Sequence, residues 1–539
     1  MVKRGTGIGW PATSIKEAAV STGSMTPQDV LWLNMDRPTN LMVVDSLVTF
    51  TTAADWEKVT GTLQERLVGR FPVFSRVPAM PSTPTGTPHW VDFPGFDIEA
   101  HIVRHTLPEP GGRAELQAYV SGQRSVPLDR DKPLWVVHYI DNFEGRSAIF
   151  TRLHHAIADG IRLTMVVLSL CDNAEGGQLG APTEVGKPKG NGGGKGLPGK
   201  AMGAVGAVGA AVGAAKDKAL GLATSPKETV VETVAGAGQR ARAVGDLAGS
   251  MAGSVAEGVL SSTMSSELLD ADRFEDYSLT VERNAKILPK LLLADSDPGP
   301  WTGELGVDKV LTWSDALPLE EIKSIGRSTG TTVNDVVISV LSSALRRYAA
   351  ERDQVVGKVA WFVPVNVRPL DQNLPPDLGN SFALIVLQMP LDIEDPVVTL
   401  AEMKARMDDI KNSLEGQLTF GIQSAIARAP ERIYTFGVEF FANRGVGVLS
   451  NVPGPQEPVF LAGHKADMIV GFAPCNGEQP MTVTIFSYNG SVRVGFAGDE
   501  GLMPDIDELP RLYRESLDAL RREVLDIEEA SIQLPASVL

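Results

Sequence analysis

The chain has 539 residues, of which 43% are hydrophobic and 21% are charged, and its formal net charge at pH 7 is −17. Such a length exceeds one ordinary hydrophobic core, so we expect at least two domains in a mostly folded protein. The excess of acidic residues argues against nucleic acid as a partner, because phosphate binding needs clustered lysine and arginine. Cys171 and Cys475 are the only cysteines, which excludes a disulfide framework and a CxxC zinc site.

The hydropathy pattern bears on membrane contact. The sequence contains no run of about 18 or more strongly apolar residues, so we expect no transmembrane helix. Residues 1–24 lack the apolar segment of a secretory signal. We therefore expect a cytoplasmic protein whose contacts with membranes are peripheral.

Residues 1–180 are predicted to form a first domain of mixed helices and strands. The segment LMVVDSLVTF, residues 41–50, is typical of a strand, and residues 56–71 carry apolar side chains at helical spacing. Two further apolar runs flank the turn-rich residues 141–145, which predicts an antiparallel hairpin. The second strand of this hairpin leads into the motif LHHAIADG, residues 153–160.

Residues 181–290 differ in composition from the rest and are predicted to be a linker rich in Gly, Ala and Lys. Between residues 187 and 227 there are seven lysines and one acidic residue, Asp217, so this part is basic within an acidic protein. Two interpretations remain open. The segment is either a solvated tether, or a small-residue helix that packs on another helix or lies on an anionic membrane.

Residues 291–539 are predicted to form a second domain of mixed type. The segment TTVNDVVISVLSSALRRYAAE, residues 331–351, has the apolar spacing of a buried helix, with Thr331 or Thr332 as N-cap. Further strands are predicted at 358–368, 380–391 and 445–455, and in the pair MTVTIFSYNG and SVRVGFAGD.

The motif LHHAIADG admits three interpretations: a catalytic site, a metal site or a strand-to-helix turn. Adjacent side chains of a strand point to opposite faces, so His154 and His155 are poorly placed to bind one metal ion. A single histidine that faces a pocket is suited to general-base work, since its usual pKa of about 6.5 leaves it neutral near pH 7. Asp159 could orient that histidine, as in a Ser-His-Asp triad, or pair with an arginine and hold the loop.

Other catalytic signatures are missing from the sequence. It contains no GxSxG elbow, no P-loop and no GxGxxG on a βαβ unit. Chemistry at the motif therefore has to proceed without a nucleophile of that type, a nucleotide-phosphate loop or a metal. Direct acyl transfer remains open, in which a base deprotonates an acceptor hydroxyl that attacks an activated acyl group.

Six segments in order resemble the bacterial wax ester synthase/diacylglycerol acyltransferase family of the CoA-dependent acyltransferase superfamily. They are SMTPQDVLWL (24–33), PLDRDKPLW (127–135), HHAIADG (154–160), TVNDVV (332–337), PVNVRP (364–369) and LSNVPGP (449–455). The resemblance covers almost the whole chain. It implies an α/β fold with mixed sheets, in which two chloramphenicol-acetyltransferase-like domains form a pseudo-dimer with the active site at their interface.

The resemblance also implies roles for the residues of the HHxxxDG motif. His155 is then the general base, and His154 supports it. Asp159 is expected to fix the loop through a salt bridge with an arginine, for which Arg368 is our candidate. Gly160 follows in the motif as a supporting residue.

Three further residues fall on family motif positions and are expected to support the site: Asn334, Asp335 and Asn451. At a helix start, capping and loop anchoring compete with substrate contact as interpretations of Asn334 and Asp335. The chain also departs from the family at Ile161 and Arg162, where small residues are frequent, so the local pocket is expected to differ.

The implied activity is transfer of a long-chain acyl group from acyl-CoA to diacylglycerol or a long-chain alcohol, giving triacylglycerol or wax ester and CoA. No metal and no cofactor are expected, acyl-CoA being a substrate. The expected location is the surface of the inner membrane or of lipid droplets. Two rivals remain: transfer to another lipid or polyketide hydroxyl, including from a carrier-bound acyl group, and a non-catalytic lipid-droplet or membrane-binding protein.

Overall fold

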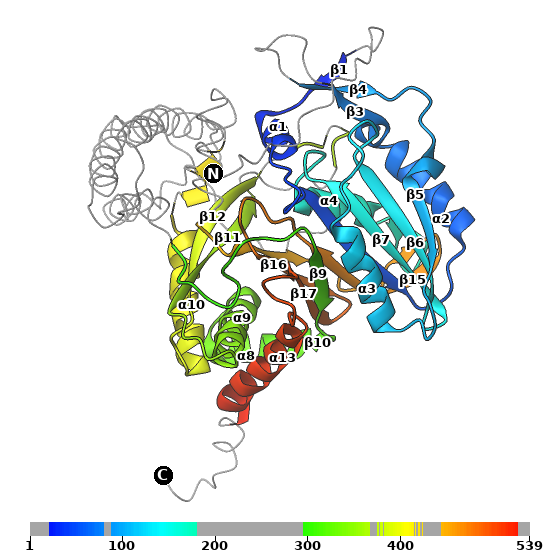
Figure 1. The fold of residues 1–539 in the computed structure, drawn as a ribbon. Coiled ribbons are helices and arrows are strands. Elements are labelled where there is room, and N and C mark those ends of the chain that lie inside the picture. The colour runs from blue at the N-terminus through cyan, green and yellow to red at the C-terminus, as the bar shows by residue number, and fades with distance from the viewer. Residues whose placement is uncertain are drawn as a thin grey trace, which may run out of the picture.

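The computed structural model describes residues 21–79, 88–179, 295–366, 374–376, 378–380, 382–413, 415–416, 419–420, 423 and 444–526. The segment predicted to be a linker, 181–290, lies outside the described residues, so both of its interpretations stay open. The described strands form two large sheets and one small sheet (Figure 1). This mixed α/β architecture confirms the predicted fold class.

The first large sheet is built mainly from the N-terminal half. Its strands run from edge to edge in the order β5 (Ile102–Thr106), β6 (Trp135–Phe143), β7 (Arg146–His154), β2 (Val43–Phe50), β15 (His464–Phe472), β14 (Phe460–Leu461) and β8 (Cys171–Asp172). β5 and β6 are parallel, whereas β6, β7, β2 and β15 pair antiparallel. β2 confirms the strand predicted at 41–50.

The predicted hairpin is formed by β6 and β7. Only Glu144 and Gly145 lie between the two strands, and both have positive φ, at 51° and 73°. Such backbone angles characterise the tight turn whose twist matches that of a hairpin, and glycine adopts them without steric cost. The hairpin therefore delivers His154 at the end of β7, where the motif begins.

Strand β15 belongs to the C-terminal half in sequence but to the first sheet in space. It pairs with β2 over six register positions, from Ala466 opposite Phe50 to Phe472 opposite Asp45. No strand was predicted for these residues. Because a strand of one half lies within the sheet of the other, the two halves are joined by backbone hydrogen bonds as well as by side-chain packing.

The second large sheet is built from the C-terminal half. Its strand order is β10 (Leu317–Pro318), β17 (Ser491–Asp499), β16 (Met481–Tyr488), β13 (Gly447–Pro453), β11 (Lys358–Asn366) and β12 (Phe382–Pro390), and β9 (Lys309–Trp313) also pairs with β17. β13 runs parallel to both β11 and β16. The strands predicted in this half are therefore confirmed.

Helices cover the sheets. They are α1 (Pro27–Asn34), α2 (Trp56–Thr62), α3 (Arg113–Arg124), α4 (Gly160–Ser169), α8 (Leu319–Thr329), α9 (Val333–Ala350), α10 (Pro396–Lys411) and α13 (Glu508–Arg521). The last four gather on one side of the second sheet (Figure 1). α9 is the helix predicted at 331–351, and Thr332 is its N-cap.

Shorter elements complete the described chain. The helix predicted at 56–71 ends as the π-helical turn η1 (Leu63–Val68), followed by the 3-10 turn η2 (Pro72–Ser75). The small sheet contains β1 (Ser21–Ser24), β4 (His89–Asp92) and β3 (Arg76–Ala79). The remaining turns are η3 (Ile98–His101) and η5 (Arg522–Asp526).

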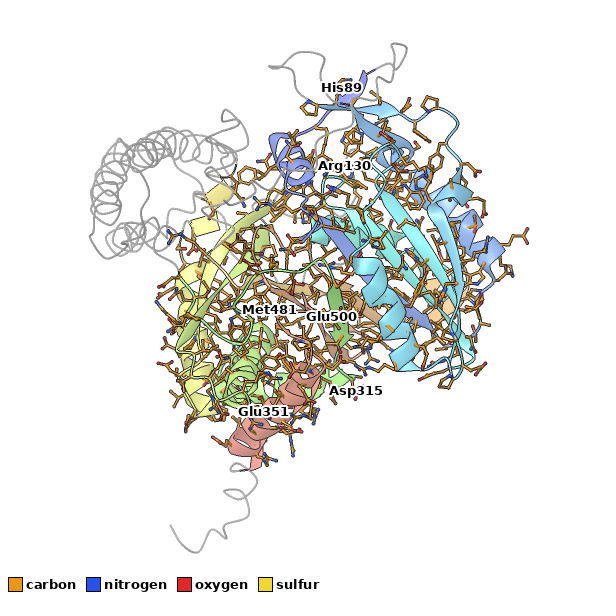
Figure 2. All side chains as sticks on the ribbon, viewed as in Figure 1. His89, Arg130, Asp315, Glu351, Met481 and Glu500 are labelled. Atoms are coloured by element: carbon orange, nitrogen blue, oxygen red, sulfur yellow. The ribbon has the colours of Figure 1, made fainter. Side chains whose placement is uncertain are left out.

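Apolar packing also joins the two halves. The core around the first sheet includes Val452, Ile469 and Phe486 from the C-terminal half, and Figure 2 shows side chains filling the space between the ribbons. Within the described parts of the chain, none of the helices has both the length and the apolar content needed to cross a membrane.

Candidate active site

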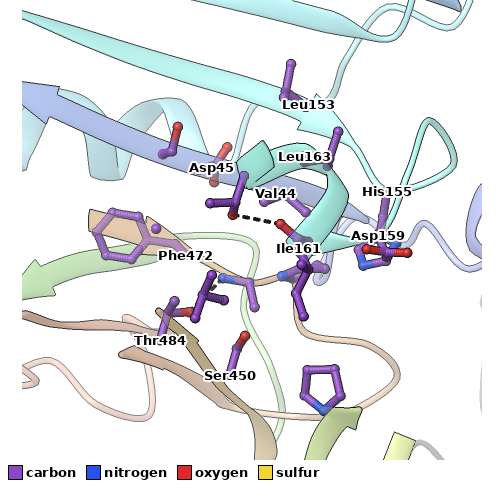
Figure 3. A pocket seen from close by; sticks show the side chains of 18 of the residues that line it. Val44, Asp45, Leu153, His155, Asp159, Ile161, Leu163, Ser450, Phe472 and Thr484 are labelled. Carbon is purple, nitrogen blue, oxygen red and sulfur yellow. Dashed lines mark hydrogen bonds between the residues drawn. The ribbon is translucent and has the colours of Figure 1, made fainter. Parts of the chain in front are cut away.

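A cavity of about 1190 Å³, counted with its open mouth, lies where the two halves meet. Its wall draws on β2, β7 and α4 of the first half and on β12, β13, β15 and β16 of the second. Figure 3 shows His155 and Asp159 on one side of this cavity and Phe472 and Thr484 on the other. Most of the residues in the cavity wall are apolar, so the cavity suits a ligand with a long hydrocarbon part.

The two adjacent histidines are placed by the end of β7. The His154 amide donates a hydrogen bond to the Leu134 carbonyl at 3.0 Å, and the His155 amide donates to the Met42 carbonyl at 2.8 Å. From this backbone the side chains diverge: His155 lines the cavity, whereas His154 faces Asp36.

His154 belongs to a buried polar cluster. Its Nε2 lies 3.2 Å from an Asp36 carboxylate oxygen, and its Nδ1 accepts a hydrogen bond from the Ala156 amide at 3.0 Å. Arg130, labelled in Figure 2, donates to the same carboxylate at 2.8 Å. Burial alone would raise the pKa of Asp36, but His154 and Arg130 lower it far below its usual value. With both ring nitrogens engaged, His154 holds the loop and does not face the cavity.

His155 has the opposite kind of environment. Its ring centre lies 4.7 Å from that of Trp32 on α1 and 5.4 Å from that of Phe382 on β12, and 7% of the residue is exposed. Burial among these aromatic rings lowers the pKa of His155 to about 4, because the protonated imidazole loses its hydration. His155 is therefore neutral at pH 7 and able to accept a proton.

Asp159 ends the motif loop and begins α4. It is the N-cap residue of that helix, and its carboxylate accepts a hydrogen bond from the Arg162 amide at 2.9 Å. The Arg162 side chain approaches the same carboxylate to 3.9 Å. Arg368, our candidate partner for Asp159, lies outside the described residues, so that pairing stays a prediction.

Gly160 is the first residue of α4 and lines the cavity. A Cβ built at this position meets nothing within 4 Å, so the absence of a side chain leaves space open in the cavity. Ile161 lines the cavity beside it. The branched side chain of Ile161 therefore forms part of the cavity wall next to the motif.

Asn334, Asp335 and Asn451 lie together, but outside the cavity wall. The Asn451 carboxamide donates to the Asn334 side-chain oxygen at 2.8 Å, which ties β13 to the start of α9. Asp335 is fully buried, accepts hydrogen bonds from Thr332 in a capping box, and lies 3.7 Å from the Lys411 amine. These contacts favour capping and anchoring over direct contact with a substrate.

The structure also brings forward residues that the sequence reasoning did not single out. Asp36 engages His154, while Trp32, Phe382 and Asn380 contact His155. Trp32 stands in the quoted segment SMTPQDVLWL, and Asn380 opens the strand predicted at 380–391. Neither segment has a sequence feature that predicts contact with a histidine, because these contacts form only in the folded chain.

Two mixed sheets, the first of which includes a strand from the C-terminal half, close on a common cavity, and this arrangement belongs to the chloramphenicol-acetyltransferase-like fold class. The family model described as the wax ester synthase/diacylglycerol acyltransferase catalytic domain matches residues 25–287, and that of the WS/DGAT C-terminal domain matches residues 378–521. The chain belongs to the wax ester synthase/diacylglycerol acyltransferase family, and it is an O-acyltransferase.

Individual relatives agree with this assignment. A Mycobacterium tuberculosis protein named as a candidate diacylglycerol O-acyltransferase is 28% identical over 533 residues, 92% of this chain and 96% of its own. The O-acyltransferase WSD of Acinetobacter baylyi is 22% identical over 490 residues, 90% of this chain and 92% of its own.

Two solved structures share the fold. The wax ester synthase/diacylglycerol acyltransferase from Marinobacter aquaeolei VT8 has a TM-score of 0.58 at 19% identity, covering 93% of this chain and 99% of its own. The first condensation domain of the calcium-dependent antibiotic synthetase has a TM-score of 0.52 at 14% identity, covering 94% and 97%.

Proposed function

We propose that this protein transfers a long-chain acyl group from acyl-CoA to the hydroxyl of diacylglycerol or a long-chain alcohol, with His155 as the general base. The observation that carries the proposal is a buried histidine, neutral at pH 7, in the wall of a largely apolar cavity between the two halves. Family membership and the names of the relatives support both substrate classes.

In the proposed reaction, the neutral imidazole of His155 removes the proton from the acceptor hydroxyl. The oxygen attacks the thioester carbonyl carbon, and the resulting tetrahedral intermediate breaks its carbon–sulfur bond. The CoA thiolate leaves and takes the proton back from the imidazolium, so the products are the ester and CoA. Because the Nδ1 atom of His155 is buried, we assign the proton transfer to Nε2.

Other residues of the site act by holding this arrangement. His154 anchors the loop through Asp36, and Asp159 caps α4 directly after it. Gly160 keeps the cavity open beside His155. We assign Asn334, Asp335 and Asn451 to the attachment of β13 to α9, since β13 lines the cavity with its neighbouring residues. In this scheme the enzyme needs no cofactor beyond its substrates.

The test compares purified wild type with His155→Ala. Each is incubated with long-chain acyl-CoA and either diacylglycerol or a fatty alcohol, and free CoA and neutral lipid are measured. General-base catalysis typically contributes about 10²- to 10⁴-fold, so His155→Ala should lose a factor of that order in kcat. A matched control is His138→Ala, because His138 is also buried with its pKa lowered to about 4 but lies outside the cavity wall.

The outcomes separate the assignments. Equal product from wild type and His155→Ala would remove His155 from the role of base. A wild type that releases no CoA with either acceptor would favour transfer to another hydroxyl, or a non-catalytic role. The acceptor that gives the higher kcat/KM identifies the preferred substrate.

Peripheral attachment to the inner membrane or to lipid droplets is part of the same proposal, since both acceptors are lipids. The basic stretch 187–227 is the candidate contact with an anionic surface. Flotation with anionic vesicles, using wild type and a variant that lacks 187–227, tests this directly. Unchanged binding on deletion would reject the role of this stretch.

A further inference from the structure

The carboxamide of Asn380 connects the catalytic loop to α1. Its Nδ2 donates one hydrogen bond to the Asp29 carboxylate at 2.7 Å and another to the backbone carbonyl of His155 at 2.9 Å. Two acceptors on one side fix which end of the amide carries the nitrogen, because the reverse orientation would place an oxygen against both of them. Only 6% of Asn380 is exposed.

Two polar atoms beside this contact lack hydrogen-bond partners among the described residues. They are Nδ1 of His155 and Oδ1 of Asn380, and both are fully buried. One is a ring nitrogen able to carry a proton, and the other is an acceptor on the residue that already holds the His155 carbonyl. Burial has the largest effect on the pKa of His155 and lowers it, while the backbone of His155 and, to a smaller extent, the Asn380 side chain act to raise it.

Asp29 accepts a hydrogen bond from the Asn380 carboxamide and is itself held in place by further hydrogen bonds. The carboxylate oxygen that takes the Asn380 carboxamide also accepts the Asn380 backbone amide at 3.0 Å. The second oxygen accepts the Thr26 amide at 2.9 Å, within the capping box of α1. Burial raises the pKa of Asp29, while these hydrogen bonds act in the opposite direction. Asp29 lies in the family-like segment SMTPQDVLWL, to which the proposed reaction gives no role.

The chain before Asn380 is fixed to the catalytic loop a second time. One Arg162 nitrogen donates to the carbonyls of Leu378 and Gly379, each at 2.7 Å. The Gly379 amide in turn donates to the Ile157 carbonyl at 3.2 Å. Arg162, a departure from the small residues frequent in the family, therefore keeps Asn380 in register with His155.

We propose that Asp29 and Asn380 form a positioning pair that holds the His155 carbonyl and so fixes the ring with its proton on Nδ1, leaving Nε2 to present its lone pair to the cavity. The inference rests on the proposed role of His155 as base. A neutral imidazole carries its proton on one of two nitrogens, and the hydrogen bond made by one decides the state of the other. Asn380 and Asp29 act through His155 and do not contact the substrate.

The test uses Asn380→Ala and Asp29→Asn in the full chain. Asn40→Ala is the matched control, because Asn40 is also buried and its Nδ2 also donates to two carbonyls, those of Gly477 and Gln479. Misplacing a catalytic group by about 1 Å costs about 100-fold in rate, so we expect kcat of Asn380→Ala to fall by about that factor with KM nearly constant. Asp29→Asn keeps the shape and one acceptor oxygen, and should lose less.

A second readout separates positioning from stability. In enzyme labelled with ¹⁵N-histidine, the His155 ring of the wild type should show a protonated Nδ1 and a bare Nε2. Asn380→Ala should show a mixture of both forms, whereas Asn40→Ala should retain the wild-type pattern even where its Tm is lower. Should Asn380→Ala fail to fold, Asp29→Asn gives the same two measurements.

The possible results distinguish the positioning pair from the proposed role of His155 as general base. A His155→Ala enzyme with wild-type kcat overturns both. An inactive His155→Ala enzyme, together with Asn380→Ala and Asp29→Asn variants that keep the wild-type kcat and ring pattern, overturns the positioning pair alone.

Discussion

The pH dependence of the reaction follows from the burial of His155. A general base works in its neutral form, and burial lowers the pKa of His155 to about 4. Activity is therefore present above that pKa and lost as the pH falls through it. At pH 5 about 90% of such a histidine is neutral, against about 3% of one with the usual pKa of 6.5, a difference of about 30-fold.

The measurement is kcat/KM between pH 4.5 and 8, which reports the free enzyme. Acyl-CoA and diacylglycerol are the substrates, and released CoA is quantified at pH 8 after quenching. Each sample is also returned from its assay pH to pH 7.5, and full recovery of activity shows that the enzyme did not unfold in acid. We expect kcat/KM to stay nearly constant from pH 8 to pH 5. A fall with a midpoint near 6.5 would show that the base is an ordinary solvated histidine and refute the reasoning.

Two further predictions concern stability. Asp45 is fully buried between Arg124, at 2.6 Å, and Arg152, at 3.2 Å. Asp45→Ala leaves both guanidinium groups without their carboxylate and should lower the free energy of unfolding by about 3–5 kcal/mol. We expect a large drop in Tm, and an unchanged Tm would contradict the pairing. A Cβ at Gly447 would lie 1.7 Å from the Met481 carbonyl oxygen across the β13–β16 pair, so Gly447→Ala should reduce soluble yield and Tm, and a variant with wild-type Tm would show that the two strands are not packed this closely.

Local patterns predicted much of the fold. The segment 331–351 combines apolar residues at helical spacing with a threonine able to cap the first turn, and α9 begins directly after Thr332. The strands at 41–50 and in the hairpin were predicted because their apolar runs end at turn-forming residues. In each case the physical cause of the element lies within the segment itself.

The strand β15 could not be found in this way. Its pairing partner, β2, lies more than 400 residues earlier in the sequence, and β15 belongs by sequence to the other half. A nine-residue strand gains its stability from neighbours on both sides and from the apolar layers it joins. Since none of these is visible locally, the exchange of this strand between the halves is a property of the tertiary fold.

The candidate site shows the same division. The motif LHHAIADG identified the two histidines as candidate site residues, and strand alternation predicted that their side chains would point to opposite faces. Their partners could not be named, because Asp36 lies 118 residues from His154 and Asn380 lies 225 residues from His155. The local sequence around a carboxylate or an amide does not predict which histidine it contacts in the folded protein.

The two histidines have neighbours of different charge, and this difference bears on catalysis. His154 has a carboxylate as its neighbour, that of Asp36, at 3.2 Å. The same arrangement at His155 would raise its pKa and remove the neutral base that attack on a thioester needs near pH 7. Asn380 contacts His155 with an uncharged amide, while the negative charge of Asp29 acts from one residue further away. On the positioning proposal, an amide in this place orients the imidazole without protonating it, which a carboxylate there could not do.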